Sequence, residues 1–171
     1  MTDIFQLATR LGNELLRKKE TLVTAESCTG GGIAQAITDI PGSSQWFDCG
    51  WVTYSNLSKT SMLHVSETLI RQYGAVSGEV VSAMAKGALQ AANGSIAIAT
   101  TGIAGPDGAT PAKPVGTVWF GLAANNWIHT ERQCFSGDRQ TVREKSVEHA
   151  LMLLLEFIET GQIKSTSGTA D

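Results

Sequence analysis

The sequence has few charged residues, no excess of basic ones and no long apolar run. Charged residues make up 17% of the 171 residues, and the net charge is −3. Phosphate contacts to DNA need clustered Lys and Arg, so this balance argues against nucleic-acid binding. No apolar run approaches the roughly 20 residues of a membrane span, and no signal peptide is apparent. We therefore predict a cytoplasmic protein with neither a nucleic acid nor a membrane as partner.

Cysteine is also scarce, with Cys28, Cys49 and Cys134 as the only examples. An odd number without C-x-x-C spacing argues against a disulfide framework and against a zinc site. The three histidines show no metal-ligand spacing either. We expect neither a metal nor a cofactor.

Apolar residues, at 42%, are abundant enough for a globular core. Their periodicity predicts helices and strands that are mixed along the chain. The predicted helices span 3–19, 32–40, 66–74, 77–93 and 138–159, and the predicted strands span 21–26, 46–56, 95–105, 115–124 and 127–136. Asn125-Asn126 is typical of a hairpin turn. This order favours an α/β fold, with a mixed sheet flanked by helices in a single layered α-β-α domain over residues 1–171 and a polar tail from about 162.

The stretch "LVTAESCTGGG" predicts a strand that passes through a glycine-rich turn into a helix. Ser27, Cys28 and Thr29 lie in this turn, where a helix N-terminus offers N–H groups to an anion or an oxyanion. A tight turn that is simply capped by Ser27 or Thr29 fits the same residues. The stretch matches neither a phosphate-binding loop nor S-x-x-K, so a base for Ser27 must come from elsewhere in the chain.

Two candidates for proton transfer follow in "VTYSNLSK", namely Tyr54 and Lys59. A lysine acts as a base only when burial or a nearby cation lowers its pKa. Taken singly, a half-buried strand tyrosine and a solvated lysine are the simpler interpretations.

Two later segments are candidates for substrate binding. The long loop that opens with "TTGIAGPDG" contains Thr101 and Gly102, which could offer a hydroxyl and N–H groups beyond a strand end. In "FSGDRQTVR", Asp138 is a predicted N-cap, and Arg139 and Arg143 share one face of the first helical turns. Two guanidinium groups at a helix N-terminus suit a phosphate, although solvated surface arginines would look the same.

Together these segments resemble one known family. "AESCTGG", "VTYSNLSK", "GAVS", "TGIAGPDG", "KPVGTVWFG" and "FSGDR" occur in the order and spacing of the CinA C-terminal domain family, over roughly Leu7 to Phe157. The resemblance implies an amidase that hydrolyses the carboxamide of nicotinamide mononucleotide, a small-molecule substrate, to nicotinic acid mononucleotide and ammonia in NAD recycling.

The resemblance also implies roles for individual residues. Ser27 is the expected nucleophile, and Lys59, assisted by Tyr54, moves its proton. The helix that begins near Gly30 is expected to stabilise the oxyanion. Cys28 is a rival nucleophile, because a helix N-terminus lowers the pKa of a thiol. The residues expected to bind substrate are Cys28, Thr29, Gly30, Gly31, Thr101, Gly102, Arg139 and Arg143.

Two other functions fit the same sequence. One is a nucleotide-binding or regulatory module without turnover, and the other is an interaction protein linked to competence or DNA damage, as the family name suggests. The acidic charge balance counts against direct DNA contact. Exposed aromatic strands also make a homo-oligomer the expected assembly.

Overall fold

The computed structural model describes residues 3–92 and 94–163, and its strands form one mixed sheet in the order β2-β1-β3-β4-β5. The strands are β1 (Leu22–Glu26), β2 (Phe47–Val52), β3 (Ile96–Gly102), β4 (Thr117–Ala124) and β5 (Trp127–Cys134). β1 pairs in parallel with β2 and β3, whereas β4 is antiparallel to both β3 and β5. The predicted hairpin at Asn125-Asn126 joins β4 to β5.

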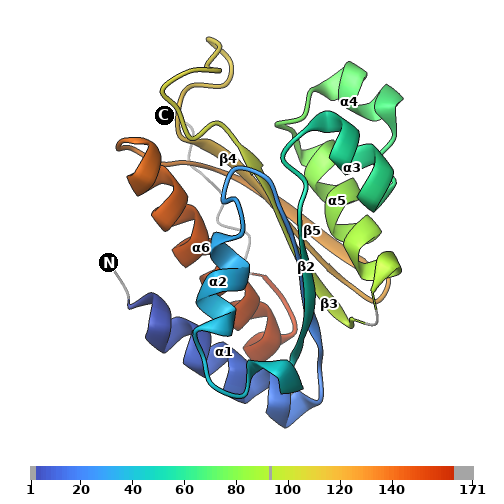
Figure 1. Cartoon of the computed structure of the whole chain (residues 1–171), viewed down its shortest axis with the longest axis vertical. Helices are drawn as coiled ribbons and strands as arrows, with labels where there is room; N and C mark the ends of the chain where they lie inside the picture. The colour runs from blue at the N-terminus through green and yellow to red at the C-terminus, as the bar shows by residue number, and fades with distance from the viewer. Residues whose placement is uncertain (1–2, 93, 164–171) are drawn as a thin grey trace.

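Helices cover both faces of this sheet, which confirms the predicted α/β class (Figure 1). α1, α2 and α6 lie on one face, and α3, α4 and α5 lie on the other. Their bounds are α1 Ile4–Lys18, α2 Gly32–Thr38, α3 Asn56–Leu63, α4 Glu67–Tyr73, α5 Gly78–Ala91 and α6 Arg139–Thr160, with a short 3-10 turn at Ser43–Gln45. Within the described ranges, no helix combines the length and the apolar character that a bilayer crossing requires.

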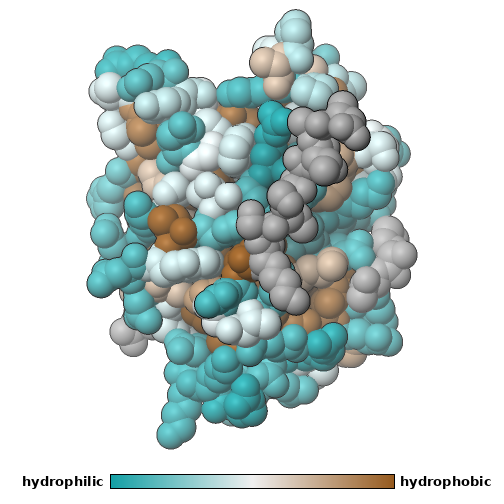
Figure 2. All heavy atoms as spheres, turned by 180° about the vertical axis from the view of Figure 1, so that it is seen from behind, coloured by the Kyte–Doolittle hydropathy of each residue, from teal (hydrophilic) through white to brown (hydrophobic). Residues whose placement is uncertain are grey.

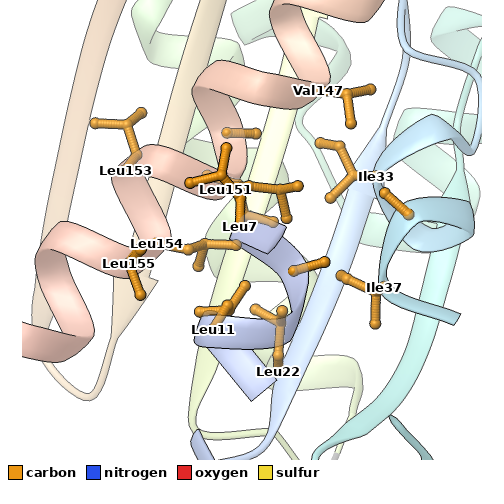
Figure 3. Packing of buried hydrophobic residues seen from close by; sticks show 14 of the residues in the cluster. Leu7, Leu11, Leu22, Ile33, Ile37, Val147, Leu151, Leu153, Leu154 and Leu155 are labelled. Atoms are coloured by element: carbon orange, nitrogen blue, oxygen red, sulfur yellow. The ribbon is translucent and has the colours of Figure 1, made fainter. Parts of the chain in front are cut away.

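Alternating side chains divide the core between the two faces of the sheet. Leu22, Ile98 and Phe120 belong to the cluster under α1, α2 and α6, where large aliphatic residues dominate (Figure 3). Their neighbours on the opposite face, such as Ala97 and Ala99, are small and belong to the cluster under α5. Successive strand residues point to opposite faces of the sheet. Large side chains therefore fill the layer under α1, α2 and α6, and small side chains let α5 lie close to the other face.

The predicted strand over 46–56 is too long, and this is the main error in the predicted elements. β2 ends at Val52, and a helix that was not predicted, α3, begins at Asn56. The reason is local, since Ser55 and Ser58 form a reciprocal capping box in which each side chain bonds the backbone N–H of the other. The predicted polar tail lies outside the described residues from position 164 onward.

The three parallel strands end at the same edge of the sheet, and pairing continues for one residue past that edge. The N–H of Ser27 donates to the carbonyl of Thr100 at 3.0 Å, and the N–H of Thr53 donates to the carbonyl of Glu26 at 2.8 Å. The segments that follow β1, β2 and β3 therefore start side by side. Figure 2 shows the molecule from behind, where mostly polar residues surround small separate apolar areas.

The packing of α5 against α3 yields a test of the fold. A Cβ at Gly87 would overlap the carbonyl oxygen of Leu63, the last residue of α3. In an open helix, Gly→Ala gains about 1 kcal/mol of stability, whereas overpacking costs about 1–3 kcal/mol. We expect Gly87→Ala to lower the free energy of unfolding in urea, and exposed Lys86→Ala to leave it nearly unchanged. A stabilised Gly87→Ala would contradict this packing.

Candidate active site

The turn after β1 places Ser27 at the sheet edge. Ser27 is 8% exposed, and its carbonyl accepts from the N–H of Gly30 at 3.0 Å, which closes a tight turn. Gly30 and Gly31 have φ values of 61° and 93°, which favour glycine. Residues without a Cβ thus let the chain reverse immediately behind the serine and enter α2.

Lys59, on the first turns of α3, reaches the same point from the other side. Its Nζ donates to Ser27 Oγ at 3.1 Å and to the Thr53 carbonyl at 2.7 Å. The residue is only 1% exposed, so burial lowers the pKa of the Lys59 ammonium from its usual value. A lysine with a lowered pKa beside a serine hydroxyl is the arrangement that nucleophile activation needs.

Cys28 is a poor rival for Ser27. Its side chain is buried, and burial raises the pKa of its thiol to about 12. Since the thiolate is the reactive form of cysteine, almost none is present near neutral pH. Cys28 nevertheless lines the same cavity as Ser27. Both residues follow the end of β1 at Glu26, so their side chains need not alternate between the two faces of the sheet.

Tyr54 and Arg139 form the outer rim of this cavity. Arg139 donates through Nη2 to the Tyr54 hydroxyl at 2.9 Å and through Nη1 to the Gly105 carbonyl at 2.8 Å. Tyr54 is 60% exposed, and no hydrogen bond joins it to Ser27 or Lys59 within the described part of the chain. The cavity has a volume of about 250 Å³ and is lined by Ser27, Lys59, Tyr54 and Arg139, among others.

Thr101 and Gly102 also line the cavity, but they are the last residues of β3 rather than part of the loop. The Thr101 hydroxyl donates to the carbonyl of Ala75 at 2.8 Å. This bond ties β3 to the segment before α5, so the hydroxyl acts as a structural donor in this state. The loop beyond contributes further lining residues that sequence reasoning missed, including Gly105 and Asp107.

Arg143 and Thr29 lie on the other side of the turn, in a neighbouring cleft of about 620 Å³ between α2 and α6. Arg143 donates through Nη2 to the Thr29 carbonyl at 2.9 Å, and the Thr29 hydroxyl pairs with that of Thr100 at 2.8 Å. Arg139 borders both the cleft and the serine cavity. The structure therefore brings Arg139, but not Arg143, to the cavity that contains Ser27.

The N–H groups at the start of α2 already have acceptors, whereas the sequence-based mechanism used them to bind the oxyanion. Glu26, which that mechanism did not use, accepts hydrogen bonds from the N–H groups of Gly31, Ile33 and Ala34. The N–H of Gly30 is bonded to Ser27, as described above. These donors are therefore not free for an oxyanion, and neither Ser27 nor Thr29 caps the helix. The sequence did contain a signal for this cap, namely a glutamate directly before the serine and the run of glycines.

Backbone donors beside the nucleophile do remain, on Cys28 and Thr29. Among the described residues, no backbone carbonyl accepts from the N–H of Cys28, and Cys28 lines the serine cavity. The residue after a nucleophile is well placed to bind the oxyanion of a tetrahedral intermediate. No group of three or more His, Cys, Asp or Glu in residues 3–92 and 94–163 could hold a metal ion.

The fold and the sequence together define a member of the CinA C-terminal domain family. Residues 4–158 match the model of that domain, so the chain belongs to this family and the family prediction is confirmed. The chain is 54% identical to the nicotinamide-nucleotide amidohydrolase PncC of Pseudomonas putida, over 92% of this chain and 98% of that protein. It is 52% identical to the protein of the same name in Escherichia coli K12, over 90% and 95% of the two chains.

Solved structures agree with this assignment. The crystal structure of a competence-damaged protein (CinA) superfamily protein from Klebsiella pneumoniae has a TM-score of 0.90 at 36% identity, covering 92% of this chain and 99% of that one. A competence/damage inducible protein from Agrobacterium tumefaciens has a TM-score of 0.90 at 38% identity, covering 94% and 98%.

Burial of Lys59 predicts a pH dependence of stability. The pKa is lowered in the folded protein, so between that value and about 10.5 the unfolded chain binds a proton that the folded chain lacks. The free energy of unfolding therefore rises with pH in this window, by at most about 1.4 kcal/mol per pH unit. Below the window, this contribution is constant and unfavourable.

We expect wild type to gain stability over Lys59→Met as the pH rises through the window, measured by urea unfolding at a series of pH values. Lys86→Met, on an exposed part of α5, controls for the loss of a lysine side chain. A difference between wild type and Lys59→Met that does not change with pH would show that burial leaves this amine unperturbed.

Proposed function

We propose that this protein is a nicotinamide-nucleotide amidohydrolase that converts nicotinamide mononucleotide to nicotinic acid mononucleotide and ammonia. The observation that carries the proposal is the 3.1 Å contact between Lys59 Nζ and Ser27 Oγ in a cavity at the sheet edge. The names of relatives that are more than half identical over nearly the whole chain point to the same substrate.

Ser27 and Lys59 carry the proposed reaction. The neutral amine of Lys59 takes the hydroxyl proton as Ser27 Oγ attacks the carboxamide carbon, giving a tetrahedral oxyanion. Lys59 then passes that proton to the amide nitrogen, the C–N bond breaks, and ammonia leaves an ester on Ser27. A water molecule attacks the ester with Lys59 again as base, which releases the carboxylate and regenerates the serine.

The oxyanion is stabilised, in this proposal, by the N–H of Cys28 rather than by the start of α2. One such donor is commonly worth about 2.7–4 kcal/mol in the transition state. The turn holds this N–H next to Ser27, and it costs no reorganisation during the reaction.

Arg139 and Arg143 are proposed to bind the nucleotide phosphate near the start of α6. Arg139 borders the serine cavity and the adjoining cleft, and Arg143 faces that cleft. A cavity of about 250 Å³ is small for a whole nucleotide, since ligand sites usually span about 300–1,000 Å³. The pyridine ring would occupy the cavity, and the phosphate would extend toward Arg139. Tyr54 holds the Arg139 guanidinium and is proposed to assist Lys59 in proton transfer.

The product of this reaction would re-enter NAD synthesis, and we propose that the enzyme acts in the cytoplasm as a homo-oligomer. The alternative, a nucleotide-binding module without turnover, would use the arginines but would have no need for a buried lysine beside a serine. Tight binding of nicotinamide mononucleotide without ammonia release would favour that alternative.

Substitution of the nucleophile tests the proposed mechanism. We expect Ser27→Ala to lower kcat for ammonia release by at least about 10³-fold, because the covalent step is lost. Cys28→Ala keeps the backbone N–H and removes only the thiol, so it should retain most activity. The measurement is ammonia release from nicotinamide mononucleotide. An active Ser27→Ala, or an inactive but folded Cys28→Ala, would contradict the assignment of the nucleophile.

Substitution of the arginines tests the phosphate site. A charge-assisted hydrogen bond is worth about 1.5–3 kcal/mol, so Arg139→Ala should raise KM for nicotinamide mononucleotide roughly 10- to 100-fold and lower kcat less. The dephosphorylated nucleoside, nicotinamide riboside, should be affected far less, because it lacks the phosphate that Arg139 is proposed to bind. The same comparison for Arg143→Ala shows whether its guanidinium meets the phosphate. Equal losses for both substrates would exclude a phosphate contact.

A further inference from the structure

The carboxylate of Glu26 is fully buried at the end of β1 and makes three hydrogen bonds to one helix N-terminus. Its Oε2 accepts from the N–H of Gly31 at 3.0 Å and of Ile33 at 3.1 Å, and its Oε1 accepts from the N–H of Ala34 at 2.9 Å. A buried carboxylate is costly unless it is paired or hydrogen-bonded in this way. Both oxygens are thus committed to the start of α2.

Ordinary capping is absent at this helix. The N-cap residue is Gly31, which has no side chain that could accept from the first N–H groups. Its φ of 93° disfavours a Ser, Thr or Asp in its place. At the preceding position, a Cβ on Gly30 would lie 3.3 Å from Arg143 Nη2. The acceptor for these N–H groups therefore comes from five residues upstream, across the turn that holds Ser27.

The side chains of Glu26 and Ser27 leave the chain in opposite directions. Glu26 follows Leu22 and Thr24 toward the α2 face, whereas Ser27 meets Lys59, which comes from α3 on the other face. Bonds from Glu26 to residues 31, 33 and 34 close a loop around residues 27–30. A shift of α2 would therefore be transmitted directly to the serine.

We infer that Glu26 is a positioning residue, whose buried carboxylate fixes the turn so that Ser27 Oγ stays within reach of Lys59. The inference rests on the proposed function, because it assigns Glu26 a part in placing the proposed nucleophile. Thr100 and Arg143 hold the same turn through the Ser27 N–H and the Thr29 carbonyl, but neither bonds the first N–H groups of α2. Glu26 ties the end of β1 directly to the start of α2.

Glu26→Gln tests this role with almost no change of shape. The carboxamide keeps one acceptor oxygen, and its NH₂ group faces N–H donors that it cannot satisfy. Misplacement of a reacting group by about 1 Å can cost roughly 10²-fold in rate. We expect kcat for ammonia release to fall about 10- to 100-fold, with KM for nicotinamide mononucleotide changed less than about threefold. Labelling of Ser27 by a fluorophosphonate, followed by mass spectrometry, should slow by a similar factor.

A purely structural role would lower stability without this selective loss. Leu154→Ala, in the same buried cluster but on the later turns of α6, serves as the stability control, because it weakens the core without altering α2 or the turn (Figure 3). Asp3→Asn, at the N-cap of α1, controls for the loss of a capping carboxylate elsewhere. Both variants should retain kcat and the Ser27 labelling rate. The assays are run below the melting midpoint of each variant, where a thermal unfolding curve shows that it is folded.

The outcomes separate the inference from the function on which it rests. Wild type that neither releases ammonia nor labels at Ser27 would reject the proposed function and leave Glu26 no nucleophile to position. Active wild type with a Glu26→Gln variant that keeps kcat and labelling within about twofold would overturn the inference alone. If Glu26→Gln does not fold, Glu26→Asp decides, since it keeps the charge and shortens the reach. Unchanged kcat in that variant would likewise overturn the inference.

Discussion

A buried amine without a carboxylate partner is the constraint on which the site depends. Within the described residues, Lys59 forms no salt bridge, and its Nζ meets only two oxygens, those of Thr53 and Ser27. A carboxylate at this place would stabilise the ammonium and raise the pKa of the lysine. Burial alone lowers that pKa, so the fold carries the cost of desolvating the amine. The benefit is a base that is available beside a serine.

Strand order explains how distant segments reach this amine. β1, β2 and β3 run in parallel and end at one edge, which brings together Ser27, the start of α3 and the end of β3. β4 then leads the chain away, and β5 returns it antiparallel, so α6 begins at the same edge. Arg139 therefore faces the serine cavity from a position more than 100 residues along the chain. The antiparallel hairpin of β4 and β5 therefore extends the sheet and also brings the start of α6 back to the edge where the site lies.

Local patterns predicted most of the elements, and the exceptions have physical causes. The helix at α6 follows from its Asp138 cap, whose Oδ1 accepts from the Thr141 N–H, and the hairpin follows from the paired asparagines. α3 was missed because "SNLSKT" lacks a clear apolar stripe and depends on a serine capping box. The proposed use of the α2 N–H groups was wrong because an acceptor from the preceding strand, Glu26, already occupies them.

Periodicity and short motifs, which are properties of neighbouring positions, were enough to predict the mixed α/β class, the family and the candidate residues Ser27 and Lys59. Which of the candidate residues meet depends on the tertiary structure. It buried Lys59 and so lowered its pKa, placed Arg139 at the serine cavity and Arg143 in the adjoining cleft, and turned Glu26 toward α2. The burial of Lys59 and the placement of the arginines are set by segments far apart in the chain, and no local pattern records them. The bonds of Glu26 are the exception, because its partners lie only five to eight residues further on.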